Sequence, residues 1–283
     1  MPKAEGRMPN VVQIAFQGEP GAYSEAAALR LRPDAETLAQ PTFEHVFECV
    51  AAGRASHGIL PVENSIAGSI HRNYDLLVDH ELPIVSEVEL PVVHHLMALP
   101  GVREADVRRV FSHPQALAQC ERFLRRLPGV ELVATYDTAG SARMIRDEGL
   151  RDAAAVASAR AAELFGLTTL HAGIQDFEDN ITRFVVISRD SEPLGPPTKT
   201  SIVFALPNAP GALFKALSVF ALRDIDLTKL ESRPLRGKPW EYLFYVDLAI
   251  AREDPACVRA LAHLSEFAKW VRTLGTYPRW TGS

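Results

Sequence analysis

The sequence predicts two units in succession, a parallel α/β domain covered by helices and a smaller α+β domain. Short apolar runs alternate with helical patterns over most of the first 190 of 283 residues, and this alternation is typical of parallel βαβ units. A Pro- and Gly-containing seam at residues 191–197 ends the pattern. Beyond it the order becomes β-α-β-β-α-β, the ferredoxin-like arrangement. We therefore predict domains at residues 10–191 and 199–278, with a linker at residues 192–198.

Strand–turn–helix units make up most of the first domain. In each, an apolar run leads through a turn rich in Gly, Ser, Asn, His or Gln into an amphipathic helix. Four such units cover residues 11–29, 57–77, 107–124 and 130–145. A further helix is expected at residues 43–51, and strands or connecting segments at 82–90 and 92–99. Ligands of such sheets lie beyond the carboxyl ends of the strands, so four polar turns predict an anion-binding cleft.

The last strand of the first domain begins with polar residues. A short strand at 153–157 and a helix at 158–165 precede a polar connection that leads to Asn180-Ile181-Thr182-Arg183-Phe184. Neighbours on a strand face opposite sides. We therefore expect Thr182 in the cleft, and Arg183 either reaching a substrate carboxylate across a bend or pairing with a carboxylate such as Glu63. β-Propensity and solvation alone are the simpler reasons for Thr and Arg here.

The second domain is predicted from its alternating pattern. Strands are expected at residues 200–206, 225–232, 240–249 and 268–277, with helices at 212–222 and 255–267. The turn from Asn208 to Gly211 opens the first helix, whose N-terminus is suited to a carboxylate. Glu231 would then face an ammonium group or brace the opposite strand. The simpler alternative is that Gly211 only permits the turn.

Composition limits the classes of function. The chain is 47% hydrophobic and 23% charged with a net charge of -5, ordinary values that give no reason to expect nucleic acid or a membrane as partner. Cys49, Cys120 and Cys257 are widely spaced, which indicates reduced thiols and neither disulfides nor zinc. Residues 1–10 lack the apolar segment of a secretory signal and are expected to be a disordered lead. A cytoplasmic location is expected.

A metal site is not expected. His94 and His95 are adjacent, so on a strand their side chains point apart, and no third ligand lies at a suitable spacing. No cofactor motif is present either, and we predict none.

Six motifs occur in order along the chain. They are Gly18-x-x-Gly21-Ala22-Tyr23-Ser24, Glu63-Asn64-Ser65-x-x-Gly68-Ser69, Ser112-His113-Pro114-Gln115, Asn180-x-Thr182-Arg183-Phe184, Gly211-Ala212-Leu213-Phe214 and Glu231-Ser232-Arg233-Pro234. With them, the chain resembles the monofunctional prephenate dehydratases over nearly its whole length, and its C-terminal unit looks like an ACT domain. The resemblance implies a two-lobed catalytic domain similar to type II periplasmic binding proteins. It also implies conversion of prephenate to phenylpyruvate, inhibition by L-phenylalanine, and a homodimer or tetramer.

The resemblance also assigns roles. The barrier of this reaction lies in expelling hydroxide, which calls for a proton donor or a strong hydrogen bond. Thr182 would be that donor, and Glu63 and His113 are candidate acids behind it, although cap and surface roles explain both. Substrate-binding residues would be Asn64, Ser65, Ser112, Gln115, Thr138, Ser141, Asn180, Arg183 and Phe184. The L-phenylalanine site, expected at a dimer interface, would comprise Asn208, Gly211, Ala212, Leu213, Phe214, Glu231, Ser232, Arg233 and Pro234.

Two rival functions stay open. Arogenate differs from prephenate by an ammonium in place of the keto group, and selecting it would need an acidic partner that the sequence does not place. A non-catalytic two-lobed sensor of an amino acid or another solute would share the architecture.

Overall fold

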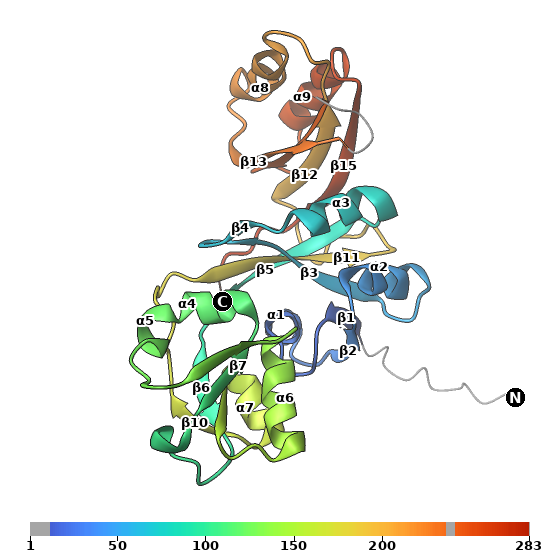
Figure 1. Ribbon diagram of the computed structural model, residues 1–283. Helices are drawn as coiled ribbons and strands as arrows, with labels where there is room; N and C mark the ends of the chain where they lie inside the picture. Colours follow the sequence, from blue (N-terminus) through green and yellow to red (C-terminus); the bar gives the residue numbers. More distant parts are fainter. Residues whose placement is uncertain (1–11, 236–240, 283) are drawn as a thin grey trace, which may run out of the picture. The chain divides into compact units, whose positions relative to one another are not determined.

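The computed structural model describes residues 12–235 and 241–282, arranged in two compact units (Figure 1). The first unit contains the described residues up to Tyr74 and Val88–Phe184, and the second contains Asp75–Glu87 and those from Val185 onward. The expected disordered lead, the domain start at residue 10 and part of the loop at 234–239 lie outside the described residues. The domain limits predicted from the sequence remain a prediction.

The first unit contains two sheets, each with its own helices (Figure 1). The first sheet has the order β11-β3-β1-β2, with β1 parallel to both β2 and β3. Its elements are β1 (Gln13–Gln17), α1 (Tyr23–Leu31), β2 (Glu36–Gln40), α2 (Phe43–Ala51), β3 (His57–Asn64), β4 (Gly68–Ser69) and β11 (Ile181–Ser188). Two further elements, α3 (His71–His80) and β5 (Ile84–Pro91), lead from one unit into the other.

The second sheet of this unit has the order β10-β6-β9-β7-β8. Its elements are β6 (His95–Ala98), the short 3₁₀ helix η1 (Glu104–Asp106), β7 (Arg109–Ser112), α4 (Pro114–Gln119), α5 (Glu121–Leu124), β8 (Glu131–Ala134), α6 (Thr138–Glu148), β9 (Ala153–Ala157), α7 (Ala159–Phe165) and β10 (Thr168–His171). Strand β9 is buried along its whole length, and its Ala and Val residues pack beneath the covering helices.

Two chain segments connect the sheets of the first unit and lie side by side. Val92 donates its backbone N–H to the carbonyl of Asn180 at 2.7 Å, and Ile174 donates to the carbonyl of His94 at 2.9 Å. Both segments therefore place polar residues at the junction of the two lobes, where β11 begins and Thr182 is its second residue.

The helix predicted over 114–124 is interrupted at Cys120. The backbone N–H of Asp176 donates to the carbonyl of Gln119 at 2.7 Å, and the Asp176 carboxylate accepts the N–H of Arg122 at 3.1 Å. These contacts use groups that a continuous helix would pair internally, so α4 ends at Gln119 and α5 begins at Glu121. The prediction of one helix was wrong because the residue that interrupts it, Asp176, lies 54 residues from Arg122 along the chain.

The second unit has the ferredoxin-like arrangement. Four antiparallel strands lie in the order β13-β14-β12-β15, and β5 pairs with β15 at Ile84 and Gly275. Its elements are β12 (Lys199–Ala205), α8 (Ala212–Ala221), β13 (Leu227–Pro234), β14 (Tyr242–Leu248), α9 (Pro255–Ser265) and β15 (Trp270–Tyr277). The predicted α/β plus βαββαβ fold class is confirmed.

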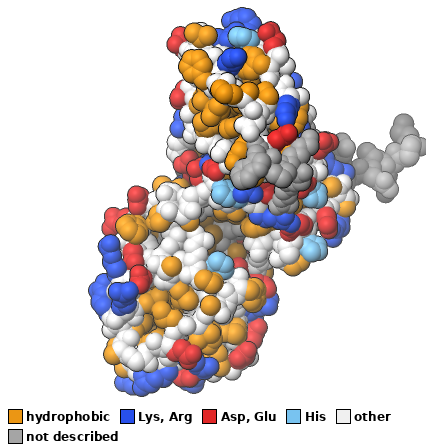
Figure 2. All heavy atoms as spheres, turned by 45° about the horizontal axis from the view of Figure 1, so that its top comes forward, with side chains coloured by type: hydrophobic (Ala, Val, Ile, Leu, Met, Phe, Trp, Pro, Cys, Tyr) orange, Lys and Arg blue, Asp and Glu red, His pale blue; other side chains and the backbone are white. Residues whose placement is uncertain are grey.

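Exposed apolar side chains are a feature of the second unit. Phe214 and Leu222 on and after α8 are 77% and 78% exposed, and Figure 2 shows hydrophobic side chains gathered on the visible face of this unit. Exposed apolar surface is typical of an interface. The expected homodimer or tetramer stays a prediction.

Candidate active site

A cavity of about 550 Å³ lies in the first unit, where residues from both lobes and from the connecting segments meet. The beginnings of four helices, α1, α2, α4 and α6, contribute to its wall. The lining residues are Gln17, Tyr23, Ser24, Pro41, Thr42, Phe43, Glu44, Pro61, Asn64, Ile70, Val92, His94, His113, Gln115, Ala116, Gln119, Tyr136, Asp137, Thr138, Thr182 and Phe184. Because helix N-termini carry partial positive charge, this wall suits an anionic ligand.

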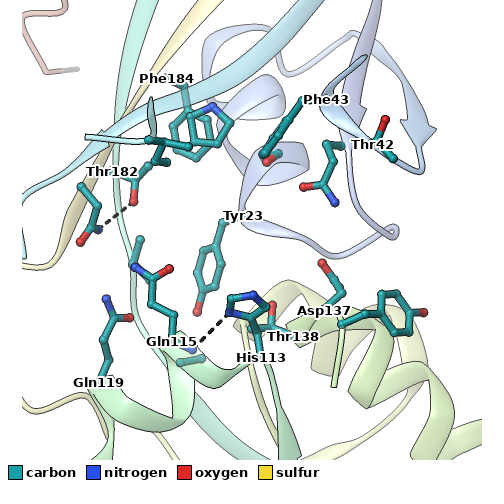
Figure 3. Close-up of a pocket in the computed structure, with 18 of the residues that line it drawn as sticks. Tyr23, Thr42, Phe43, His113, Gln115, Gln119, Asp137, Thr138, Thr182 and Phe184 are labelled. Atoms are coloured by element: carbon teal, nitrogen blue, oxygen red, sulfur yellow. Dashed lines mark hydrogen bonds between the residues drawn. The ribbon is translucent and has the colours of Figure 1, made fainter. Parts of the chain in front are cut away.

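The hydroxyl of Thr182 is held by the side-chain amide of Asn64 (Figure 3). Asn64 Nδ2 donates to Thr182 Oγ1 at 3.0 Å and to Asn180 Oδ1 at 2.7 Å. The orientation of this amide is fixed because its Oδ1 accepts the backbone N–H groups of Ile66 at 3.1 Å and Ala67 at 2.8 Å. Thr182 Oγ1 is therefore an acceptor towards Asn64, and its own proton is available to another acceptor.

A chain of hydrogen bonds continues from Asn180 across the cavity. Asn180 Nδ2 donates to Gln119 Oε1 at 3.2 Å, and Gln119 Oε1 lies 2.9 Å from His94 Nε2. His94 Nδ1 lies 2.9 Å from the Tyr23 hydroxyl. With Gln119 Oε1 accepting from Nε2–H, Nδ1 is an acceptor towards Tyr23, whose single hydroxyl proton is shared between His94 Nδ1 and the Val93 carbonyl, 2.7 Å away. The chain links Thr182, at the start of β11, to α4 and α1.

The two titratable members of this chain are neutral. Burial lowers the pKa of His94, and the hydrogen bond with Gln119 raises it by a smaller amount. Burial also raises the pKa of Tyr23 well above its usual value, and Cys120 adds to the effect. Tyr23 is therefore a hydroxyl donor and His94 a neutral imidazole, and both act as fixed hydrogen-bonding groups of the cavity wall.

His113 and Gln115 line the cavity from the other lobe of the first unit than Thr182. His113 is the N-cap of α4, and its Nδ1 accepts the backbone N–H of Gln115 at 3.2 Å. Its Nε2 is the nitrogen left to carry a proton towards a ligand. Figure 3 shows the Gln115, Tyr23 and Thr182 side chains around the same open space.

Two carboxyl groups line the cavity, and their pKa values are shifted in opposite directions. Glu44 pairs with Arg72, and hydrogen bonds from its own backbone and from Arg72 lower its pKa to about 2. Asp137 is the N-cap of α6 and accepts the N–H of Gly140 at 2.8 Å. Burial raises the pKa of Asp137, against the opposing effect of the Gly140 and Ala139 N–H groups.

The structure separates the predicted site residues into two groups. Thr182, His113, Asn64, Gln115, Thr138 and Phe184 line the cavity. The six other predicted catalytic-domain residues, Glu63, Ser65, Ser112, Ser141, Asn180 and Arg183, do not appear in its wall as described. Their roles in catalysis or binding stay predictions.

The three predicted serines each make backbone contacts. Ser65 donates to the carbonyl of Asp179 at 2.6 Å, and Ser112 donates to that of Val156 at 2.6 Å. Ser141, 1% exposed, donates to the carbonyl of Asp137 at 2.8 Å. These bonds hold the strands and the α6 N-terminus that carry the lining residues.

Arg183 takes the second of the two arrangements expected for it. Its Nη2 lies 3.2 Å from Glu63 Oε2 and 3.3 Å from the Tyr74 hydroxyl. Thr182 and Arg183 thus face opposite sides of β11, as neighbours on a strand must. Arg183 braces β11 against β3, the strand that carries Asn64.

Several lining residues were not predicted. Tyr23 and Ser24 belong to the first glycine-containing motif, and Thr42 is a recognisable N-cap, whose side chain accepts the N–H of His45 at 3.4 Å. Gln119 and His94 carry no local signal, because each reaches the cavity through the junction of the two connecting segments.

A smaller cavity of about 130 Å³ lies in the second unit. It is lined by Leu206, Pro207, Asn208, Ala209, Ala212, Leu213, Tyr242 and Phe244. Asn208, Ala212 and Leu213 belong to the predicted L-phenylalanine site. Gly211, in the left-handed conformation at φ +77°, is the N-cap of α8, and Phe214 is exposed. Glu231, Ser232, Arg233 and Pro234 lie on β13, where Arg233 pairs with Asp75 at 2.8 Å.

Among the described residues, no group of three His, Cys, Asp or Glu side chains is placed to hold a metal ion. None of the helices within the described ranges has the length and apolar character needed to cross a bilayer.

Fold and cavity together define a two-lobed ligand-binding enzyme domain followed by a ferredoxin-like regulatory domain. Family comparison agrees: residues 14–192 match the prephenate dehydratase model and residues 200–264 match the ACT domain model. The chain belongs to the prephenate dehydratase family. It is a dehydratase, a carbon–oxygen lyase, as the sequence predicted.

Relatives and solved structures match nearly the whole chain. "Arogenate dehydratase/prephenate dehydratase 2, chloroplastic" of Arabidopsis thaliana is 51% identical over 94% of this chain and 73% of its own length. A structure described as prephenate dehydratase in complex with L-Phe from Arthrobacter aurescens is 33% identical, with a TM-score of 0.87, covering 95% of this chain and 90% of that one. A structure described as "GqqA- a novel type of quorum quenching acylases" is 41% identical, with a TM-score of 0.88 over 95% and 98% of the two chains.

The expected cytoplasmic location is wrong. Arabidopsis thaliana relatives at 51% and 48% identity are named as chloroplastic proteins. Reduced cysteines indicate only a reducing compartment and do not distinguish one such compartment from another, which is why the sequence argument failed.

Proposed function

We propose that this chain removes water and carbon dioxide from prephenate, to give phenylpyruvate, and from arogenate, the counterpart that carries an ammonium in place of the keto group. The supporting observation is the contact between Asn64 Nδ2 and Thr182 Oγ1 at 3.0 Å. It makes the hydroxyl oxygen an acceptor from Asn64 and leaves the hydroxyl proton to be donated into the cavity. A donor held in place before the reaction stabilises charge that develops on a leaving oxygen.

In the proposed reaction the bond between the ring and its carboxylate breaks, and its electron pair enters the ring. The bond from the opposite ring carbon to the hydroxyl breaks at the same time, so the ring becomes aromatic. Hydroxide leaves with its negative charge stabilised by Thr182 and takes one proton to become water. Prephenate dianion plus one proton thus gives phenylpyruvate, carbon dioxide and water. That proton comes from solvent, and His113, whose Nδ1 accepts the N–H of Gln115, is proposed to direct the hydrogen bond of its Nε2–H into the cavity.

The charge of the wall supports this chemistry. The anionic substrate would be held by neutral donors such as Gln115 and Thr138 and by the positive ends of the converging helices. Weak, distributed contacts also suit a carboxylate that must leave, because tight binding of the ground state would slow its loss.

Regulation by L-phenylalanine is proposed for the second unit. The 130 Å³ cavity contains three predicted ligand residues, Asn208, Ala212 and Leu213, beside the N-terminus of α8. A homologous structure carries L-Phe. An amino-acid carboxylate at this helix end and an aromatic side chain among Leu206, Leu213 and Phe244 would fit the cavity's chemistry.

One structural relative is described as an acylase, which makes amide hydrolysis the second candidate. A hydroxyl nucleophile needs a neighbouring base to accept its proton. The group bonded to Thr182 Oγ1 is the Asn64 amide, a donor. This arrangement favours a hydrogen-bond donor over a nucleophile at Thr182.

Purified protein should convert prephenate to phenylpyruvate, measured by the absorbance of the enolate in alkali. Thr182→Ser should retain appreciable turnover, whereas the isosteric Thr182→Val should lose about 10²- to 10³-fold in kcat. Wild-type protein that turns over neither prephenate nor arogenate would refute the proposal. A fully active Val variant would remove Thr182 from its assigned role.

A further inference from the structure

The ionisable side chains that line the catalytic cavity include acids but no Lys or Arg among the described residues. Of the described residues that line it, none is Lys or Arg, while two, Glu44 and Asp137, are carboxylic acids. A cavity for a dianionic substrate would be expected to contain the reverse. Beside these carboxylates a positive charge on a ligand is therefore favoured, while the helix N-termini elsewhere in the wall suit the ligand's carboxylates.

The two carboxylates are not equivalent. Glu44 is already compensated by Arg72. Asp137, by contrast, makes no ion pair with Lys or Arg among the described residues, and its carboxylate accepts the backbone N–H groups of Gly140, at 2.8 Å, and Ala139. Burial raises the pKa of Asp137 and Glu19 adds to the effect, against the smaller opposing effects of the Gly140 and Ala139 N–H groups and of His113, so the carboxylate is poorly solvated and gains from an incoming cation.

Asp137 is also placed at the right end of the cavity. Figure 3 shows Thr182 and Asp137 on opposite sides of the open space, with Tyr23 between them. In prephenate and arogenate the leaving hydroxyl and the three-carbon side chain sit on opposite carbons of the ring. A substrate whose hydroxyl faces Thr182 therefore directs its side chain, keto or ammonium, away from Thr182 and towards the side of Asp137.

We propose that Asp137 is a specificity-determining residue that binds the side-chain ammonium of arogenate and makes arogenate the preferred substrate over prephenate. The inference rests on the proposed dehydratase function of this cavity. A keto group offers Asp137 no charge and no proton to accept, so prephenate leaves this half-buried carboxylate without a cationic partner.

Asp137→Asn is the test variant because it removes the charge and keeps the shape. Asn is as good an N-cap as Asp, so α6 retains its first hydrogen bond. Asp137→Ser is a second variant with a different capping side chain and no charge. Asp254→Asn is the matched control, since Asp254 is the N-cap of α9 in the other unit and accepts the N–H of Ala256 at 2.7 Å. Glu44→Gln removes the compensated carboxylate of the same cavity.

The measurement is kcat/KM of the full chain with arogenate and with prephenate, separately. Wild type should prefer arogenate. Asp137→Asn and Asp137→Ser should each lose at least about tenfold in kcat/KM for arogenate and lose little or nothing for prephenate. Asp254→Asn and Glu44→Gln should keep the wild-type ratio of kcat/KM for arogenate to kcat/KM for prephenate.

The opposing outcomes are distinct. A wild-type preference for prephenate, or equal losses for both substrates in the Asp137 variants, would overturn the role of Asp137 while leaving the dehydratase function in place. A ratio that shifts in Glu44→Gln as much as in Asp137→Asn would also overturn it. Wild-type protein inactive on both substrates would instead reject the dehydratase proposal itself.

Discussion

Asn64 Nδ2 and Thr182 Oγ1 lie 3.0 Å apart, and the direction of this hydrogen bond is fixed by the other end of the same amide. Asn64 Oδ1 accepts two backbone N–H groups in the turn that follows β3. The amide can therefore not rotate to present its oxygen to Thr182 without losing both. A turn of the backbone thus sets which way the threonine hydroxyl can donate.

Asn64→Asp should separate this orientation from packing. The carboxylate keeps an acceptor for the turn but replaces the donor to Thr182 with a second acceptor, which the threonine hydroxyl would then bond. We expect kcat to fall by about 10²- to 10³-fold, the usual effect of misdirecting one such donor. Steady-state kinetics and a thermal melt on the same sample are the measurement. A variant with wild-type kcat would show that the amide does not orient Thr182.

The sequence predicted the parts of the site that depend on local rules. Strand alternation placed Thr182 and Arg183 on opposite faces, and the polar turns marked the ends of the strands. Gln119 illustrates what local rules miss, because it faces the cavity only where Asp176 interrupts the helix. Ser112 and Ser141 have the right side chain for binding, and their binding roles stay predictions. In the structure each hydroxyl donates a hydrogen bond to a backbone carbonyl that the fold brings close, a contact that local sequence does not show.

His94 should make folding stability depend on pH. Burial lowers the pKa of this imidazole below its ordinary value of 6.5. Just below pH 6.5 the unfolded chain therefore binds more protons than the folded one, and stability falls as the pH drops. Gln at this position can accept from Tyr23 and donate to Gln119 without titrating. His94→Gln should thus show a smaller loss of thermal midpoint between pH 7.5 and 5.5 than wild type.

His95→Gln is the neighbouring control for this pH dependence. Burial also lowers the pKa of His95, but its side chain is only half-buried, so removing it should flatten the curve less. Equal slopes for wild type and His94→Gln would mean that the buried imidazole does not titrate in this range. If only His95→Gln changed the slope, the pH dependence of stability would come from His95 and not from His94.

Lys199 should be required for the stability of the second unit. It is 4% exposed and lies 2.8 Å from Glu87 and 3.6 Å from Asp247, both also buried. Removing the cation takes a buried positive charge away from two buried carboxylates, so Lys199→Met should cost about 3–5 kcal/mol in the free energy of unfolding. Lys269→Met, which breaks a 2.8 Å pair with Glu241 at a more exposed site, should cost under about 1 kcal/mol. Urea titration measures both, and similar costs would show that burial does not decide the effect.

Ala212 should decide whether the small cavity of the second unit is the L-phenylalanine site. If L-phenylalanine binds the folded protein there, saturating ligand should raise the thermal midpoint of the full chain. Ala212→Leu puts a larger side chain into the 130 Å³ cavity and should abolish that rise. Ala221→Leu makes the same change at an exposed position of the same helix and should keep it. A full rise in Ala212→Leu would place the ligand elsewhere, and no rise in wild type would remove L-phenylalanine as the regulator. The α8 N-terminus and its neighbouring Leu and Phe side chains are the chemical reason to expect the first result.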